Sequence, residues 1–129
     1  MKLAFEKMDG LIPAVIQDHE TKEVLMLGFV DETALGCTRR SGEVHFFSRS
    51  KKRLWKKGET SGHVLRVKEI LVDCDADALV IRVEANGPGV CHEGYRTCFF
   101  RKLQSDGTVH VIAEKTFSEA EVYGIKEQG

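Results

Sequence analysis

The feature that most constrains the fold of this chain is its division into short apolar runs separated by polar turns. The runs "LIPAVIQD" (residues 11–18) and "EVLMLGF" (residues 23–29) each have the length of one strand, and the polar residues between them favour a hairpin. A second pair of runs, residues 63–72 and 78–84, alternates polar and apolar residues as half-buried strands do. We therefore expect strands at residues 11–18, 23–29, 43–48, 63–72, 78–84, 95–103 and 108–113. The strand at 78–84 should pair with that at 63–72, and the last two strands should form a hairpin that turns at residues 105–107.

One segment between these runs has the signals of a short helix. Asp31 can cap its first turn, and Gly42 follows its last residue. The inward face of this helix would carry Ala34, Leu35 and Thr38. Strands with one or two short helices predict an α+β fold, in the form of a β-rich single domain.

The chain of 129 residues has the length of one domain. We expect a core over about residues 9–103, a long polar loop at residues 50–62, and a peripheral segment at residues 104–129 whose end (114–129) is helical. The start "MKLAFEKMDG" lacks a long apolar core, and no run is long enough to span a bilayer. These features predict a cytoplasmic protein with no membrane partner. A formal net charge of -1 argues against non-specific nucleic-acid binding.

The stretch "DCDAD" (residues 73–77) places a thiol between carboxylates. If it is extended, Asp73, Asp75 and Asp77 lie on one face and Cys74 on the other. The carboxylate face would suit Mg²⁺ or Ca²⁺, whereas a thiolate prefers zinc. The alternative is a plain turn, because aspartates are common between strands and Cys74 can serve as a small buried apolar residue. Both interpretations remain open at this point.

Two further cysteines favour metal binding. In a reducing compartment, cysteines are more often ligands, nucleophiles or core residues than disulfides. Cys74, Cys91 and Cys98 lack the close Cys-x-x-Cys spacing of structural zinc sites. Three thiolates without a fourth fit a catalytic zinc that keeps one position open for water. Because zinc lowers the pKa of bound water to about 7, hydrolysis is the expected chemistry.

Several stretches together resemble one known family. The stretches "FSRSKKRLWKKGETSGH", "VKEILVDCDADAL" and "GPGVCHEGYRTCFFR", with "GLIPAVIQD" and "EVLML" before them, are similar to the phosphoribosyl-AMP cyclohydrolases. The likeness runs from about Asp9 to Arg101. The commoner family form reads "DCDGDAL", so Ala76 stands where that form has glycine. This difference removes no ligand.

The resemblance implies two metal sites and a dimer. It implies Mg²⁺ ligands at Asp73, Asp75 and Asp77, and zinc ligands at Cys74, Cys91 and Cys98. It also implies an intertwined homodimer with one zinc per subunit. Each zinc would take Cys74 from one subunit and the other two thiolates from its partner. A thiol that points away from its flanking carboxylates can face a neighbouring chain.

The resemblance further implies an enzyme of histidine biosynthesis. Its substrate would be 1-(5-phosphoribosyl)-AMP, and a zinc-bound hydroxide would attack C6 of the adenine ring. The N1–C6 bond would then open, giving the formimino-aminoimidazole carboxamide ribotide product of the pathway's third step. This reaction is the hydrolytic opening of a cyclic amidine and not a deamination.

A substrate with two phosphates needs anion-binding groups at both ends, and the polar segment 48–63 contains such groups. Arg49 can pair bidentately with phosphate, Lys57 supplies a point charge, and Trp55 can stack on a base. We expect substrate contacts from Ser48, Arg49, Ser50, Trp55, Lys57, Thr60, Ser61 and Gly62. The plainer alternative is a solvated basic loop anchored in the core by Trp55.

His63 and His92 are the candidate catalytic residues for proton transfer, because neutral imidazole can relay protons near physiological pH. An isolated histidine is more often structural, but "SGH" and "CH" both match motifs of the family. The sequence does not assign the acid or the base.

Two other functions compete with this hydrolase. A zinc-dependent nucleic-acid-binding module would use the basic residues of "RSKKRLWKK" (49–57) to grip phosphates and Trp55 to stack a base. The near-zero net charge and the missing fourth thiol argue against it. A zinc nucleoside deaminase would need a His-x-Glu and a Pro-Cys-x-x-Cys signature, which the sequence lacks.

Overall fold

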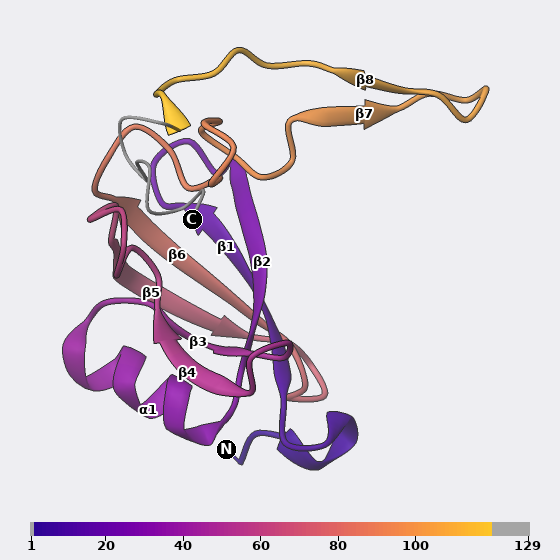
Figure 1. Ribbon diagram of the computed structural model, residues 1–129. Helices are drawn as coiled ribbons and strands as arrows, with labels where there is room; N and C mark the ends of the chain where they lie inside the picture. Colours follow the sequence, from indigo (N-terminus) through magenta and orange to yellow (C-terminus); the bar gives the residue numbers. More distant parts are fainter. Residues whose placement is uncertain (1, 120–129) are drawn as a thin grey trace.

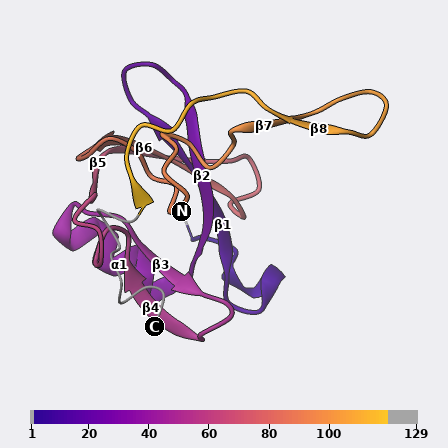
Figure 2. The same ribbon diagram turned by 45° about the horizontal axis from the view of Figure 1, so that its top comes forward.

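The computed structural model describes residues 2–119, and Figures 1 and 2 show its strands and helices from two directions. In chain order the elements are the 3₁₀ helix η1 (Phe5–Met8), β1 (Ile12–Asp18), β2 (Val24–Val30), α1 (Glu32–Ser41), β3 (His45–Ser48), β4 (Arg53–Lys56), β5 (Leu65–Val72), β6 (Leu79–Ala85), β7 (Arg101–Leu103) and β8 (Val109–Val111). This content confirms the β-rich α+β class. No helix within residues 2–119 is both long and apolar enough to cross a bilayer.

A four-stranded sheet in the order β2-β1-β6-β5 forms the centre of the molecule. Both hairpins expected from the sequence, β1–β2 and β5–β6, are antiparallel pairs. The two hairpins are joined by parallel pairing of β1 with β6, which places Ile16 opposite Ile81. The sequence pattern did not predict the pairing of β1 with β6. The alternation within a strand indicates which of its faces is buried, but it does not indicate which strand lies beside it.

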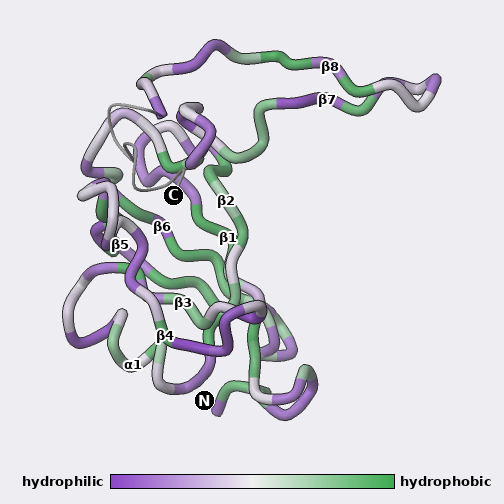
Figure 3. The backbone as a smooth tube through the Cα atoms, in the orientation of Figure 1, coloured by the Kyte–Doolittle hydropathy of each residue, from purple (hydrophilic) through white to green (hydrophobic). Residues whose placement is uncertain are grey.

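One face of this sheet carries the hydrophobic core. Along both central strands, fully buried side chains alternate with more exposed ones, as the period of two requires. The buried apolar side chains on these two strands are Ile12, Ala14, Ile16, Leu79, Ile81 and Val83. Figure 3 shows hydrophobic stretches along β1, β2 and β6. The two central strands therefore provide the rigid base for the loops at their ends.

Phe46 of β3 is the largest fully buried side chain in this core. Its ring lies so close to Gly28 of β2 that a Cβ atom at residue 28 would come within 2.5 Å of the ring. Trp55 of β4 packs beside it, with the two ring centroids 5.4 Å apart. Burial of such a phenylalanine contributes about 1.5–3 kcal/mol to stability. A larger residue at position 28 would therefore displace the side chain that fixes β3 on the sheet.

The helix expected from the sequence is confirmed. The Asp31 side chain accepts a hydrogen bond from the Ala34 N–H at 2.7 Å, and Gly42 ends the helix in the left-handed conformation with a φ of 75°. The buried residues of α1 are the predicted Ala34, Leu35 and Thr38. The Thr38 hydroxyl also accepts the His45 N–H at 2.9 Å, which ties the helix to the start of β3.

The prediction of one continuous loop over residues 50–62 was wrong in part. Arg53–Lys56 form β4, which pairs with β3 and places Trp55 opposite Phe46. The many basic residues of this segment made it resemble a solvated loop in the sequence. Of the residues of β4, only Trp55 packs against the core. The β3–β4 hairpin lies beside α1 (Figure 1), and the loop of residues 57–62 follows β4.

The β7–β8 hairpin extends away from the central sheet as an arm in both ribbon views (Figures 1 and 2). We call residues 101–111 the arm. Its strand residues are all exposed, including Leu103 at 71%, Val109 at 54% and Val111 at 57%. The arm thus presents an apolar surface that the single chain leaves uncovered.

The predicted bounds of this last hairpin were too long. Residues 95–100 form no strand, because their backbone groups bond to other parts of the chain, such as the Cys98 N–H to the Leu25 carbonyl at 2.7 Å. The expected turn is present, since the Gln104 N–H reaches the Thr108 carbonyl at 2.7 Å. A helical tail was expected over residues 114–129, but residues 114–118 are not helical, and residues 120–129 lie outside the described residues.

Candidate functional site

The "DCDAD" stretch forms the turn between β5 and β6, so of the two interpretations that the sequence left open the turn is confirmed and the extended conformation is wrong. The Asp73 carboxylate accepts hydrogen bonds from the N–H groups of Asp77 at 3.0 Å and Ala78 at 3.3 Å. Ala76 has a positive φ of 62°, which reverses the chain direction. We call residues 73–78 the acidic turn. Its fold follows the common pattern in which an aspartate side chain bonds the backbone ahead of it.

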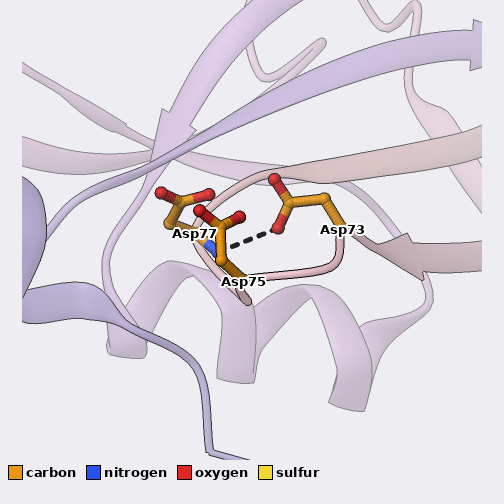
Figure 4. A group of neighbouring side chains, drawn as sticks. All are labelled: Asp73, Asp75 and Asp77. Carbon is orange, nitrogen blue, oxygen red and sulfur yellow. Dashed lines mark hydrogen bonds between the residues drawn. The ribbon is translucent and has the colours of Figure 1, made fainter.

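The turn nevertheless brings the predicted carboxylates together (Figure 4). Oxygen atoms of Asp73, Asp75 and Asp77 all lie within 4.8 Å of one another. The hydrogen bond between Asp75 and Asp77 raises the pKa of Asp77 and, with help from Lys7, lowers the pKa of Asp75. Three carboxylate oxygens at this spacing fit a hard divalent cation such as Mg²⁺.

A second cluster lies in the loop that follows β6. The Cys91 N–H donates to the Tyr95 carbonyl at 3.1 Å, and the Cys91 carbonyl accepts from Gly94 at 3.0 Å. This tight loop places the thiols of Cys91 and Cys98 beside each other, and we call residues 90–98 the thiol loop. Part of Cys98 reaches the surface of the single chain, but many protein atoms surround its thiol. The pKa of the Cys98 thiol is raised to about 11, mainly by burial and secondly by the neighbouring Cys91.

Lys57 provides a positive charge beside this thiol pair. Its ammonium donates a hydrogen bond to the Val90 carbonyl at 2.7 Å. Burial lowers the pKa of Lys57, while Cys98 and Cys91 act to raise it. Two adjacent thiols with a nearby cation form a donor set that suits zinc, because thiolates are favoured zinc ligands and Lys57 compensates their charge.

The thiol loop is held against the β1–β2 hairpin by residues that sequence analysis did not identify. The Arg96 guanidinium pairs with Asp18 at 3.0 Å and with Glu23 at 2.7 Å. The Thr97 hydroxyl donates to the Val24 carbonyl at 2.8 Å. Neither residue carries a sequence signal, because the partners are more than seventy residues away in the chain. These contacts fix the loop that presents both thiols.

Asp18 is the buried member of this anchor. Burial acts to raise its pKa, but hydrogen bonds from the N–H groups of Thr21 and Glu20, together with Arg96, bring the pKa of Asp18 below its ordinary value. Asp18 therefore remains ionised over the usual working range of pH. A charged and hydrogen-bonded carboxylate at this point keeps Arg96, and with it the thiol loop, in place.

Cys74 lies apart from the other two cysteines. It is exposed in the acidic turn, which precedes β6, whereas the thiol loop follows β6. Seven strand residues separate these two ends, a span of about 20 Å at the usual rise of a β-strand. Within residues 2–119, the only group with three or more close metal-ligating side chains is the acidic turn. One chain thus unites two of the three predicted zinc ligands.

A pocket of about 370 Å³ opens beside the thiol loop. Among the residues predicted for the site, its lining contains Ser48, Trp55, Lys57, Thr60, Ser61 and His92. The lining also includes Lys51, Arg53 and Glu59, of which Arg53 and Glu59 form an ion pair at 2.9 Å. Lys57 and His92 connect the two features, because both line the pocket and lie beside or within the thiol loop.

The other predicted binding residues lie outside this lining. The Arg49 guanidinium stacks on the ring of Phe29 with 3.9 Å to the centroid, so its planar face is occupied. The Ser50 hydroxyl lies 3.4 Å from that of Ser48. The Gly62 N–H donates to the Gly58 carbonyl at 2.8 Å and closes the turn that carries Thr60 and Ser61.

His63 is packed under the loops and does not line the pocket. Its Nδ1 atom is buried and has no hydrogen-bond partner among the described residues. The ring meets Phe117 edge-on at 5.1 Å between centroids, and a Cβ atom at Gly87 would come within 2.6 Å of the ring. The Thr116 N–H donates to the Gly94 carbonyl at 2.8 Å, so the segment around Phe117 reaches both His63 and the thiol loop.

Comparisons with known proteins agree with the sequence resemblance. A family model described as phosphoribosyl-AMP cyclohydrolase matches residues 26–100. The phosphoribosyl-AMP cyclohydrolase of Solibacter usitatus is 53% identical over 126 residues, covering 98% of this chain and 99% of the relative. The proteins of the same name from Geobacter sulfurreducens and Methanocella arvoryzae are 54% and 51% identical, and cover 92% of this chain and 94% and 95% of their own lengths.

Proposed function

The chain belongs to the phosphoribosyl-AMP cyclohydrolase family, and we propose that it hydrolyses the adenine ring of 1-(5-phosphoribosyl)-AMP in the third step of histidine biosynthesis. In this reaction water adds to C6 and the N1–C6 bond breaks. The product is the formimino-aminoimidazole carboxamide ribotide, and both phosphates are retained. The proposal is supported most directly by the adjacency of the thiol loop and the pocket through His92.

We propose that Cys91 and Cys98 hold a zinc ion together with Cys74 of the partner subunit. The two thiols already lie beside each other, and the chain's own Cys74 is at the opposite end of β6. When zinc is bound, it lowers the pKa of a water molecule so that hydroxide becomes available at neutral pH. The thiol loop supplies two of the three ligands already in place, and Lys57 compensates the negative charge of their thiolates.

The shared site requires a homodimer, and we propose that it is intertwined through the arm. The arm's apolar side chains are uncovered in the single chain, as are Val24 and Leu27 on β2. Surfaces of this kind are covered in stable assemblies. A second copy of the chain would cover this apolar surface and would also supply Cys74 of the partner subunit to the zinc site.

The pocket next to this site is the proposed binding place for the substrate. Its cations Lys51 and Arg53 can pair with phosphate oxygens, and Thr60 and Ser61 offer hydroxyl donors. Trp55 lines the same pocket and can stack on the purine. Its volume of about 370 Å³ falls within the usual range for small-molecule sites.

His92 is the proposed proton-transfer residue, because it lies in the pocket and directly follows Cys91. It is placed to accept a proton from the attacking water or to deliver one to N1 as the C–N bond breaks. His63 is packed behind the loops, so we assign it to positioning. The unsatisfied Nδ1 of His63 leaves one hydrogen-bonding atom available to the bound complex.

The acidic turn is the proposed Mg²⁺ site, with Asp73, Asp75 and Asp77 as oxygen ligands. In the proposed dimer, Cys74 of one subunit brings its own acidic turn to the partner's thiol loop. The cation then lies near the pocket, where it can hold a substrate phosphate. We further propose a cytoplasmic location and no nucleic-acid partner. The Arg53–Glu59 pair neutralises part of the basic segment that such a partner would need.

The decisive experiment is an absorbance assay of ring opening in phosphoribosyl-AMP by the purified protein, before and after chelation. Zinc and magnesium are then added back separately. We expect activity to require zinc and to be lost in Cys91→Ser. Absence of turnover in protein that is fully loaded with zinc would overturn the proposed reaction.

A further inference from the structure

Lys7 places a positive charge directly on the acidic turn. Its ammonium lies 3.3 Å from the Oδ2 atom of Asp75 and 3.2 Å from the Oδ2 atom of Asp77. Those carboxylates belong to the group whose oxygens lie within 4.8 Å of one another. The turn therefore already holds a cation, and that cation is part of the chain.

The backbone keeps Lys7 at this position. The Ala4 N–H donates to the Ala76 carbonyl at 2.8 Å, which fastens the start of η1 to the acidic turn. The Gly10 N–H donates to the Phe5 carbonyl at 2.8 Å and closes the helix at its other end. Phe5 also packs against the core. Only the flexible side chain of Lys7 is free to move away from the carboxylates.

A divalent ion and this ammonium cannot occupy the same oxygens. Mg²⁺ binds carboxylate oxygens at about 2.1 Å, and an ion there would lie within a few ångströms of the Lys7 nitrogen. Two like charges at such a distance repel each other, and the ammonium would have to swing away. The carboxylates would thus exchange one cation for another.

We propose that the Lys7 ammonium is a built-in competitor for the cation site of the acidic turn, and that it sets how tightly Mg²⁺ binds there. This inference rests on the proposed magnesium site. Lys7 is not a ligand. Because the Lys7 ammonium must be displaced first, a metal ion needs a high charge density to bind at the acidic turn. A monovalent ion does not have this charge density.

The test is Mg²⁺ binding to the full chain by isothermal titration calorimetry, with Mn²⁺ binding by electron paramagnetic resonance as a second probe. Removing the competitor in Lys7→Met, or in the polar variant Lys7→Gln, is expected to tighten binding about fivefold, because exposed ion pairs are individually weak. Lys7→Arg keeps the charge and should bind no more tightly than the unmodified protein.

Lys68→Met is the matched control. Lys68 has the same side-chain exposure as Lys7, 45%, and is paired with Glu84 at 3.4 Å. The change in net charge is identical, so we expect its affinity to stay within about twofold, since charges beyond a Debye length are largely screened. Asp75→Asn identifies binding at the acidic turn, because it should remove that binding in every background.

The results of these titrations distinguish the competitor role of Lys7 from the proposed magnesium site on which it rests. Tighter binding in both Lys7→Met and Lys7→Gln, with Lys7→Arg and Lys68→Met unchanged, supports the competitor role. Equal affinity in all Lys7 variants, with binding still lost in Asp75→Asn, overturns that role and leaves the magnesium site in place. Binding that is absent, or insensitive to Asp75→Asn in every variant, overturns both.

Discussion

The two ends of β6 carry the two clusters of ligand-type side chains, and these clusters are built in different ways. The acidic turn is held by hydrogen bonds among its own residues, with Asp73 accepting from Asp77 and Ala78. The thiol loop is held by distant parts of the chain, since Arg96 pairs with Asp18 and Glu23. Asp73, Cys74 and Asp75 of the acidic turn are exposed, whereas Cys91 is buried.

This difference predicts different responses to change. A local turn keeps its geometry as long as its own few residues are intact. A loop anchored from afar depends on the whole sheet, and a substitution on β1 should reach its thiols. The proposed zinc site combines both kinds of element, because Cys74 comes from the acidic turn of one subunit and the other thiols from the loop of its partner.

The largest expected effect is complementation between two inactive variants. Cys74→Ser and Cys91→Ser should each lose nearly all activity, since each removes a zinc ligand from both sites of a homodimer. A heterodimer of the two variants, isolated through two affinity tags, contains one intact site and one doubly altered site. It should recover about half of the unmodified activity in the ring-opening assay.

Cys37→Ser provides the control for loss of a thiol, because Cys37 lies on α1 and contacts Arg40 instead of either cluster. Its activity should be unchanged. A heterodimer as inactive as its parents would contradict a site shared between subunits and would place all three ligands of one zinc within one chain.

The next effect concerns the anchor of the thiol loop. Arg96→Ala removes both ion pairs to the β1–β2 hairpin, and we expect zinc affinity to fall by about 10–100-fold, as for other groups that orient metal ligands. Arg96→Lys should recover part of this loss, because it keeps one charged contact. Competition with a chromophoric chelator measures the affinity.

Arg82→Ala is the matched control for this prediction, since Arg82 also pairs with a carboxylate, that of Glu69, but lies on β6 away from the thiols. The absorption spectrum of cobalt-loaded protein adds a readout of ligand geometry. A loss of stability without any change in zinc affinity or cobalt spectrum would show that Arg96 is a structural residue only.

The local features of the chain could be predicted from its sequence. The β1–β2 and β5–β6 hairpins, the capped helix and the grouping of the aspartates all depend on residues close in the chain, and the structure confirms them. Of the two conformations left open for residues 73–77, the turn was correct and the extended form was wrong, because an aspartate that bonds the backbone ahead outweighs strand alternation.

The other features of the fold and the site could not be predicted from local sequence patterns. The parallel pairing of β1 with β6 and the Arg96 anchor join residues that are far apart in sequence. Strand β4 was missed because its charged residues resemble a solvated loop, although Trp55 packs on the core. In each case a long-range contact decided the structure, and one sequence contains no direct signal for such a contact.

A smaller effect is the pH dependence of the anchor. Because hydrogen bonds and Arg96 bring the folded-state pKa of Asp18 below 3.8, its stabilising contribution is full above pH 3.8 and is lost as pH falls through the lower folded-state value. Asp18→Asn should lower the free energy of unfolding by about 1–2 kcal/mol at neutral pH. The difference from the unmodified protein should shrink below pH 3.8, as followed by urea unfolding. A difference that stays constant down to pH 2 would contradict this role.

The smallest effect tests the local character of the acidic turn. Ala76 has a φ of 62°, a conformation that glycine adopts without strain and alanine does not. Ala76→Gly should therefore stabilise the fold slightly, by at most about 1 kcal/mol, because relief of strain outweighs both the loss of one buried methyl group and the added freedom of the unfolded chain. Ala78→Gly, two residues further on, lacks this strain and should destabilise by about 0.5–1 kcal/mol. Urea unfolding of both variants measures the contrast. If both glycines destabilised equally, the conformation of the acidic turn would be imposed by its surroundings, as that of the thiol loop is.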